Sequence, residues 1–212
     1  MRKKTAALSN DVEQVAPISR PVRADAQRST DALLEAALEV FATSGVDAPV
    51  REIADRAGVG IATLYRRFPQ RADLIVAVFR HEVDACADAA VVLAAEHAPG
   101  EALALWMQRY ADFIGTKRGL ASALHSGDPA FNTLPAYFDT RLQPALSALL
   151  DAAAASGEVR SGVAPNDLLR AVGNLCMSVR DDRGDYAQRM VTLLVDGLRY
   201  GANTSLNTSA PP

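Results

Sequence analysis

Hydrophobic positions recur at helical spacing along most of the chain. Between residues 24 and 45 one stripe holds Leu33, Ala37 and Phe41, and Gly45 ends the run. Similar stripes predict further helices over about residues 49–57, 61–68, 71–96, 101–115, 118–125, 134–156, 166–180 and 185–200. Proline or glycine residues separate most of them, and no segment alternates apolar and polar residues as a strand would. The pattern therefore predicts an all-α protein of about nine helices.

The segment AGVGIATLYRRF, residues 57–68, allows two interpretations. Gly58, Gly60 and Thr63 come close to the glycine spacing of a dinucleotide-binding loop, which requires a β-strand before the glycines. Here a short amphipathic helix precedes them, and a threonine occupies the third glycine position. In the other interpretation Gly58 ends one helix and Ile61 begins the next, which gives a helix-turn-helix with the second helix as the recognition element. The predicted helices favour this second interpretation.

The exposed positions of the second helix carry hydroxyl and guanidinium groups, which suit phosphates and base edges. Leu64 and Phe68 are expected to face the core instead. We predict a DNA-binding set of Gly60, Ile61, Thr63, Tyr65, Arg66, Arg67 and Arg71, in which Gly60 serves backbone geometry.

The distribution of charge agrees with this prediction. Residues 51–71 contain five arginines against two carboxylates, a balance of +3, although the whole chain has a formal net charge of −3. A small basic patch on an acidic body is typical of a protein that touches phosphate with one face.

Composition argues against several other classes. The longest fully apolar run, residues 89–95, is too short to span a bilayer, and the N-terminus lacks the apolar stretch of a signal peptide. We therefore expect a soluble cytoplasmic protein with no membrane partner. Cys86 and Cys176 lie far apart, which excludes a disulfide framework or a CxxC site.

The histidines do not indicate catalysis or metal binding. His81, His97 and His125 have no recognisable metal-ligand spacing and do not pair with a serine or cysteine in a nucleophile motif. We expect no metal, no cofactor, no catalytic residues and no enzyme activity.

Residues 24–80 resemble the TetR (tetracycline-repressor-type) family of transcriptional regulators. The residues that carry the resemblance are Val50, Ile53-Ala54, Ala57-Gly58-Val59, Thr63-Leu64-Tyr65, Phe68, Arg71 and Leu74. Family members often have serine at position 60, lysine at 61, and histidine or tyrosine at 67, so the operator preference cannot be transferred. The segment ASGEVRSGVAPNDLL, residues 155–169, extends the resemblance more weakly towards the C-terminus.

The resemblance implies a division of the chain and a function. The expected parts are a disordered arm (1–23), a helix-turn-helix DNA-binding domain (24–70), a ligand-binding and dimerisation domain (71–201) and a disordered tail (202–212). The implied function is that of a ligand-responsive regulator, most simply a repressor, that binds a near-palindromic double-stranded DNA operator as a homodimer and is released by a small effector. The alternative is a helical small-molecule-binding or catalytic protein that no longer reads DNA.

An aromatic stripe marks the candidate effector site. Trp106, Tyr110 and Phe113 recur on one face of a predicted helix, and other helices supply possible facing residues. Such a stripe is more often plain core, although an apolar cavity with a few polar groups is where a small, mostly apolar or aromatic ligand would bind. The predicted ligand-binding set is Trp106, Tyr110, Phe113, Phe138, Asn174 and Met177, with Asn174 as a buried amide that needs a partner.

The last two predicted helices are apolar and contain small residues. Paired with the same helices of a second copy, they would bury a symmetric four-helix interface. The predicted interface residues are Leu168, Val172, Leu175, Met190, Leu194 and Leu198.

Overall fold

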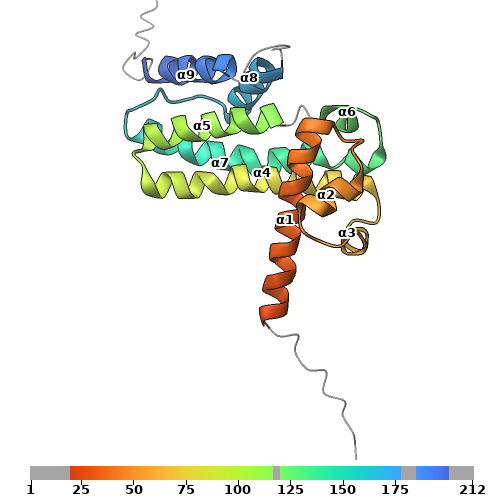
Figure 1. Cartoon of the computed structure of the whole chain (residues 1–212). Helices are drawn as coiled ribbons and strands as arrows, with labels where there is room; N and C mark the ends of the chain where they lie inside the picture. Colours follow the sequence, from red (N-terminus) through yellow and green to blue (C-terminus); the bar gives the residue numbers. More distant parts are fainter. Residues whose placement is uncertain (1–19, 117–119, 178–184, 201–212) are drawn as a thin grey trace, which may run out of the picture.

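The computed structural model describes residues 20–116, 120–177 and 185–200. This part of the chain forms nine α-helices, one 3-10 helix and no strand, which confirms the all-α prediction (Figure 1). The helices are α1 (Arg20–Ser44), α2 (Val50–Arg56), α3 (Ile61–Arg67), α4 (Arg71–Glu96), α5 (Pro99–Thr116), α6 (Ala121–Leu124), η2 (Pro129–Phe131), α7 (Leu134–Ala155), α8 (Pro165–Met177) and α9 (Asp185–Tyr200).

Helix α1 begins at Arg20, so residues 20–23 belong to this helix and not to the N-terminal arm that the sequence predicted. The remainder of the arm, the C-terminal tail and residues 178–180 of the predicted eighth helix lie outside the described residues.

Helices α1 to α3 form a small unit around its own apolar centre. Leu33, Ala37 and Phe41 of α1 are buried against α2 and α4, as their spacing predicts. Ile53 of α2 and Leu64 of α3 are buried beside them. Because each short helix buries one face in this centre, its other face is fixed towards solvent.

The turn between α2 and α3 depends on Gly58. This residue has a backbone φ of +66°, a left-handed conformation that residues with a Cβ atom rarely adopt. Its N–H donates to the Asp55 carbonyl and the Val59 N–H donates to the Ala54 carbonyl, which together make a Schellman motif at the end of α2. Gly60, by contrast, has φ −67° and caps α3 without a side-chain hydrogen bond.

The two glycines give a matched pair of substitutions. Gly58→Ala should lower the free energy of unfolding by about 1 kcal/mol, because alanine is strained at positive φ. Gly60→Ala should change it by less than about 0.5 kcal/mol, since its backbone angles suit alanine and no heavy atom lies within 4 Å of the new Cβ. Urea unfolding of both variants at one protein concentration measures the difference. Equal losses would show that positive φ does not decide this turn.

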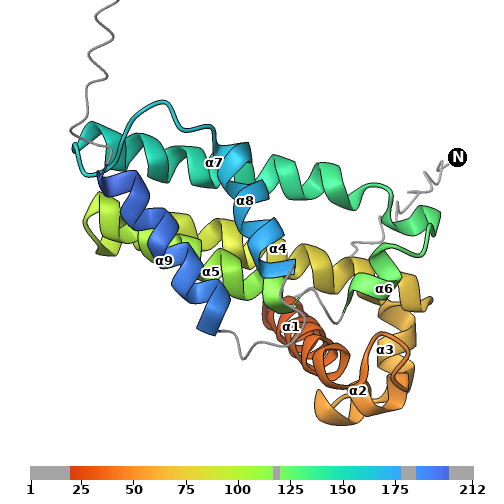
Figure 2. The same cartoon turned by 90° about the horizontal axis from the view of Figure 1, so that it is seen from above.

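The larger unit is a helical bundle. Helices α4, α5 and α7 pack side by side, while α8 and α9 cover the face formed by α5 and α7 (Figures 1 and 2). Helix α4 is 26 residues long and packs against α1 at its N-terminal end and against α5 and α7 beyond it. It therefore belongs to both units, which makes it a direct mechanical link between them.

Candidate nucleic-acid interface and interior cavities

The outer face of α3 carries three large polar side chains. Tyr65 is 50% exposed, and Arg66 and Arg67 are exposed beside it. Leu64 and Phe68 point the other way into the core, as predicted. The tip of α3 therefore presents a phenol and two guanidiniums from a backbone that the core holds in place.

The start of α3 is less open than its tip. Thr63 is half-buried, and its hydroxyl accepts a hydrogen bond from Arg66 at 3.4 Å. Ile61 is half-buried against the core, which leaves a smaller surface for DNA contact than the sequence alone suggested. Gly60 is exposed, and its lack of a side chain keeps this end of the helix slim.

Arg71 has a different position from the other predicted DNA-binding residues. It is half-buried at the start of α4, and its guanidinium donates a hydrogen bond to the Val46 carbonyl in the loop between α1 and α2. Since Val46 is 25 positions earlier in the chain, this bond ties α4 to the helix-turn-helix unit. Arg71 thus has a structural partner that no sequence pattern indicated.

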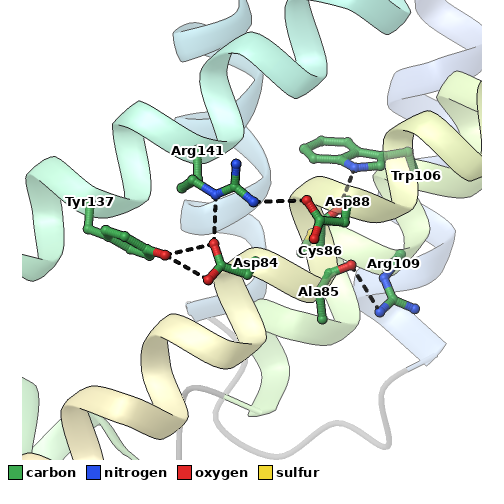
Figure 3. A network of polar contacts seen from close by, with 8 residues as sticks. All are labelled: Asp84, Ala85, Cys86, Asp88, Trp106, Arg109, Tyr137 and Arg141. Atoms are coloured by element: carbon green, nitrogen blue, oxygen red, sulfur yellow. Dashed lines mark hydrogen bonds and ion pairs between the residues drawn. The ribbon is translucent and has the colours of Figure 1, made fainter. Parts of the chain in front are cut away.

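The aromatic stripe of α5 is closed against solvent. Trp106 and Tyr110 are fully buried, with their rings stacked at 5.6 Å between centroids. Trp106 Nε1 donates to the Cys86 carbonyl at 2.8 Å (Figure 3), and the Tyr110 hydroxyl donates to the Leu169 carbonyl at 3.1 Å. Burial raises the pKa of Tyr110. Both polar tips are satisfied inside the protein, so these two residues are packed as core.

The other predicted ligand residues do not share one environment. Phe113 is buried, whereas Phe138 is half-buried 6.2 Å from both Phe113 and Tyr110 by ring centroids. Asn174 is exposed, so the expectation of a buried amide is wrong: the residue lies on the outer side of α8. The side chain of Met177 lies outside the described residues.

A cavity of about 310 Å³ lies beside this aromatic cluster, between α4, α6, η2 and α7. Its lining is mostly apolar, with two ionisable side chains. The lining residues are Phe79, Leu124, His125, Phe131, Leu134, Pro135, Phe138 and Asp139. Phe138 is the one residue that this cavity shares with the ligand-binding set predicted from the sequence.

The described residues offer no metal centre, and the Cys86 thiol is not activated. No group of three His, Cys, Asp or Glu side chains among them is arranged to hold a metal ion. Burial raises the pKa of the Cys86 thiol to about 12, which keeps it protonated and unreactive at neutral pH. No helix in the described part of the chain is long and apolar enough to cross a membrane.

Comparison with known proteins identifies both units. Residues 33–78 match the bacterial regulatory proteins of the tetR family, and residues 98–200 match the C-terminal domain of SbtR-like transcriptional regulators. A TetR transcriptional regulator from Streptomyces coelicolor is 40% identical, and the match covers 80% of this chain and 97% of that one with a TM-score of 0.71. The chain belongs to the TetR family of transcriptional regulators. The resemblance predicted from the sequence is thereby confirmed.

Other TetR-family structures are also similar. A TetR transcription regulatory protein from Mycobacterium vanbaalenii is 36% identical, with a TM-score of 0.65 over 84% of this chain and 99% of that one. The TetR-like regulator LfrR from Mycobacterium smegmatis, solved in complex with proflavine, is 25% identical, with a TM-score of 0.59 over 82% and 97%. No curated protein matches the chain closely enough to count as a relative.

The predicted interface residues of this TetR-family protein divide into two groups. Leu168, Val172 and Leu198 are buried within the protomer, so they hold α8 and α9 on the bundle and present no surface to a partner. Leu175, Met190 and Leu194 are half-buried and remain partly available. The difference arises because each helix has two apolar sectors, one facing its own bundle and one facing outwards.

The outward apolar sector of α9 includes residues that the predicted set omitted. Leu193 is 64% exposed and Tyr200 is 90% exposed, with Tyr186 and Gly197 also on the surface. With Met190 included, these residues follow one another at intervals of three or four positions, which places them in one stripe. The same spacing is visible in the sequence.

A series of polar contacts joins α4 to α7 (Figure 3), and we call it the α4–α7 ladder. Arg141 donates from Nε to Asp84 at 2.6 Å and from Nη2 to Asp88 at 2.8 Å. The Tyr137 hydroxyl donates to the Asp84 carboxylate at 2.7 Å. The Arg80 guanidinium lies 4.9 Å from the centre of the Tyr137 ring. Each contact uses residues spaced one helical turn apart on the two helices.

The α4–α7 ladder ends near the cavity. Its last rung is a 3.4 Å hydrogen bond from Arg80 Nη2 to Thr133 Oγ1, next to the cavity residues Phe79 and Leu134. Residue numbers rise together along both helices, from the Arg80–Thr133 pair to the Asp88–Arg141 pair, so α4 and α7 run in the same direction here. The ladder therefore fixes how far α4 can slide along α7, a role that the sequence analysis missed although the i,i+4 spacing was visible.

Arg141 should be the most sensitive residue of the α4–α7 ladder. Arg141→Lys should lower the free energy of unfolding by about 1 kcal/mol, because an ammonium cannot serve both carboxylates as the guanidinium fork does. Asp88→Asn should cost less than about 0.5 kcal/mol, since that side chain is 73% exposed. Urea unfolding at fixed protein concentration compares them. A loss at Asp88 as large as at Arg141 would contradict this ranking.

Proposed function

We propose that the protein is a homodimeric, ligand-responsive transcriptional repressor that binds a near-palindromic DNA operator and acts in the cytoplasm, where its DNA target lies. The observation that supports this best is the outer face of α3, where Tyr65, Arg66 and Arg67 are exposed together on a helix braced by the core. A helical protein without a DNA partner would have no use for this combination. The proposal includes no enzyme activity and no cofactor.

In the proposed complex α3 enters the major groove. The N-terminal residues of a recognition helix approach base edges, while flanking basic and hydroxyl side chains contact phosphates. We assign Arg66 and Arg67 to these contacts, with Tyr65 and Thr63 as hydroxyl donors. Two copies of α3 in one dimer would have to lie about 34 Å apart to reach successive major grooves. The DNA-binding domain in this proposal begins with α1 and ends at residue 70, and residues 71–201 would bind the effector and dimerise.

Dimerisation would use the outward stripe of α8 and α9. Exposed apolar side chains on adjacent helices are costly in water and favour association with a like surface. Leu193, Leu194 and Met190 of α9 would meet the same residues of a second copy, with Leu175 of α8 at the edge. Two helices from each copy then form a four-helix interface.

Effector binding would act through α4, which packs against both units. A ligand shifts the balance between two conformations only by its difference in affinity for them. Release of operator by about 100-fold would require roughly 2.7 kcal/mol of preference for the non-binding conformation. A mostly apolar or aromatic effector agrees with the lining of the described cavity, and LfrR was solved with proflavine.

A gel shift with the DNA that flanks the protein's own gene tests the proposal. At low salt and without ligand, the protein should retard a fragment that contains the operator. An excess of unrelated DNA should displace this fragment only weakly. No shift with any flanking fragment would favour the alternative, a helical small-molecule-binding or catalytic protein that does not read DNA.

A further inference from the structure

We propose that the cavity between α4, α6, η2 and α7 is the effector site, and that it takes a molecule of one or two aromatic rings carrying a basic group, which pairs with Asp139. This inference rests on the proposed function. It moves the site away from Trp106 and Tyr110, which are buried and hydrogen-bonded within the core.

The walls of the cavity are aromatic and braced from behind. Phe79 and Phe138 line it, and both contact Phe113, with ring centroids at 6.4 Å and 6.2 Å respectively. Phe138 also lies 6.2 Å from Tyr110, whose own hydroxyl is anchored to α8. Because these rings are held in position before any ligand arrives, an aromatic ligand can extend the cluster without first ordering it.

The size of the cavity restricts the ligand. A volume of about 310 Å³ is at the lower end of the range of small-molecule sites, about 300–1,000 Å³. One or two fused rings with a short substituent fit this space, and a long acyl chain does not. The apolar wall formed by Leu124, Phe131 and Leu134 favours a ring system over a sugar or a nucleotide phosphate.

Asp139 gives the site its charge preference. Its carboxylate is exposed at the cavity wall and has no hydrogen bond or ion pair to another residue in the described ranges. A ligand ammonium would gain a charge-assisted hydrogen bond with Asp139, whereas a ligand carboxylate would meet repulsion from it. His125, the other ionisable residue of the lining, already has an interaction of its own. A neutral ligand would displace water from Asp139 with no compensating charge.

The place of the cavity explains how occupancy would reach the DNA-binding unit. Phe79 belongs to α4 and Leu134 to α7, so a ligand between them acts on the separation of these helices. The hydrogen bond of the α4–α7 ladder nearest to it, from Arg80 to Thr133, is also the longest of the ladder's hydrogen bonds at 3.4 Å. A shift of α4 at this point would also move Arg71 at the start of the same helix, and Arg71 is hydrogen-bonded to the helix-turn-helix unit.

Three naphthalenes that differ only in charge provide the test: 1-naphthylmethylamine, 1-naphthalenemethanol and 1-naphthoate. Calorimetric titration of the full-length protein should show tightest binding for the amine, by about tenfold over the naphthoate. Asp139→Asn should remove this preference. Asp151→Asn, an exposed carboxylate further along the same helix, is the matched control and should leave all three affinities unchanged.

A second variant tests the location. Phe138→Leu keeps an apolar side chain but removes the ring, and should weaken all three ligands by about two- to tenfold. Thermal unfolding of each variant checks that the fold is intact. Equal affinities in wild type and Asp139→Asn would overturn the charge assignment, and no binding, or binding unaffected by Phe138→Leu, would overturn the site.

Operator gel shifts separate this inference from the proposed function. Saturating amine should weaken operator binding by the wild type and not by Asp139→Asn. Binding of the amine with no change in operator affinity would overturn the effector role of the cavity. A protein that shifts its flanking DNA but binds none of the naphthalenes would refute the inference alone, whereas ligand binding without any DNA shift would refute the proposed function alone.

Discussion

Leu193→Arg should convert the protein to a monomer that no longer binds its operator. The side chain is 64% exposed in the protomer and lies in the outward stripe of α9. In a symmetric dimer the substitution places two guanidiniums in an apolar interface without a counter-charge, which costs about 3–5 kcal/mol. Since one half-site gives too little affinity, operator binding should collapse with the dimer. Sedimentation velocity and gel shifts measure the two effects.

Val92→Arg is the matched control for this experiment. Val92 is a comparably exposed apolar residue, at 54%, but it lies on α4 away from the stripe. That variant should remain dimeric and bind DNA. Leu193 is a sharper probe than Leu194, because Leu194 is half-buried against its own bundle and its replacement would also disturb the protomer. A fully dimeric Leu193→Arg protein would place the interface elsewhere.

The double variant Arg66→Ala/Arg67→Ala should lose operator affinity and most of its salt dependence. If each arginine neutralises one phosphate per protomer, a dimer loses four phosphate contacts. The slope of log affinity against log salt should then flatten by about 3 to 4. Binding measured between about 50 and 200 mM salt gives this slope. An unchanged slope would show that neither arginine contacts phosphate.

Arg71→Ala provides the contrast within the same basic segment. Because Arg71 donates to the Val46 carbonyl, its loss should lower the free energy of unfolding by about 1 kcal/mol. The salt slope should change little. If Arg71→Ala flattened the slope as much as one of the α3 arginines, Arg71 would also be a phosphate contact.

Local sequence signals were sufficient for the helix-turn-helix. The predicted recognition helix, residues 61–68, corresponds to α3 (Ile61–Arg67), and the predicted 71–96 to α4 (Arg71–Glu96). The turn depends on one glycine at positive φ and on hydrogen bonds within six residues of it. Such information lies in adjacent positions, so the sequence alone determined this unit and its family.

The effector domain was less predictable, since its features depend on how distant helices are rotated against one another. Helical periodicity marked Trp106, Tyr110 and Phe138 as apolar positions. It could not determine that Trp106 and Tyr110 are buried and donate hydrogen bonds to backbone carbonyls of α4 and α8. Nor could it determine that Phe138 lines a cavity. Leu124, Phe131 and Leu134 join that cavity from segments with no common pattern.

The rotation of α8 and α9 in the bundle also decides which of their two apolar sectors is buried and which is exposed. Local patterns were enough to predict that both helices are apolar, that the fold is all-α, and that α3 carries the exposed arginines. The packed helices were needed to establish that Val172 and Leu198 face inwards while Leu193 faces outwards. The same holds for the hydrogen bond from Arg71 to Val46 and for the bridge from Arg141 to two carboxylates of α4. Periodicity gives the angle between side chains on one helix, whereas burial and partners depend on the rotation of each helix within the bundle, which is set by packing between residues far apart in the chain.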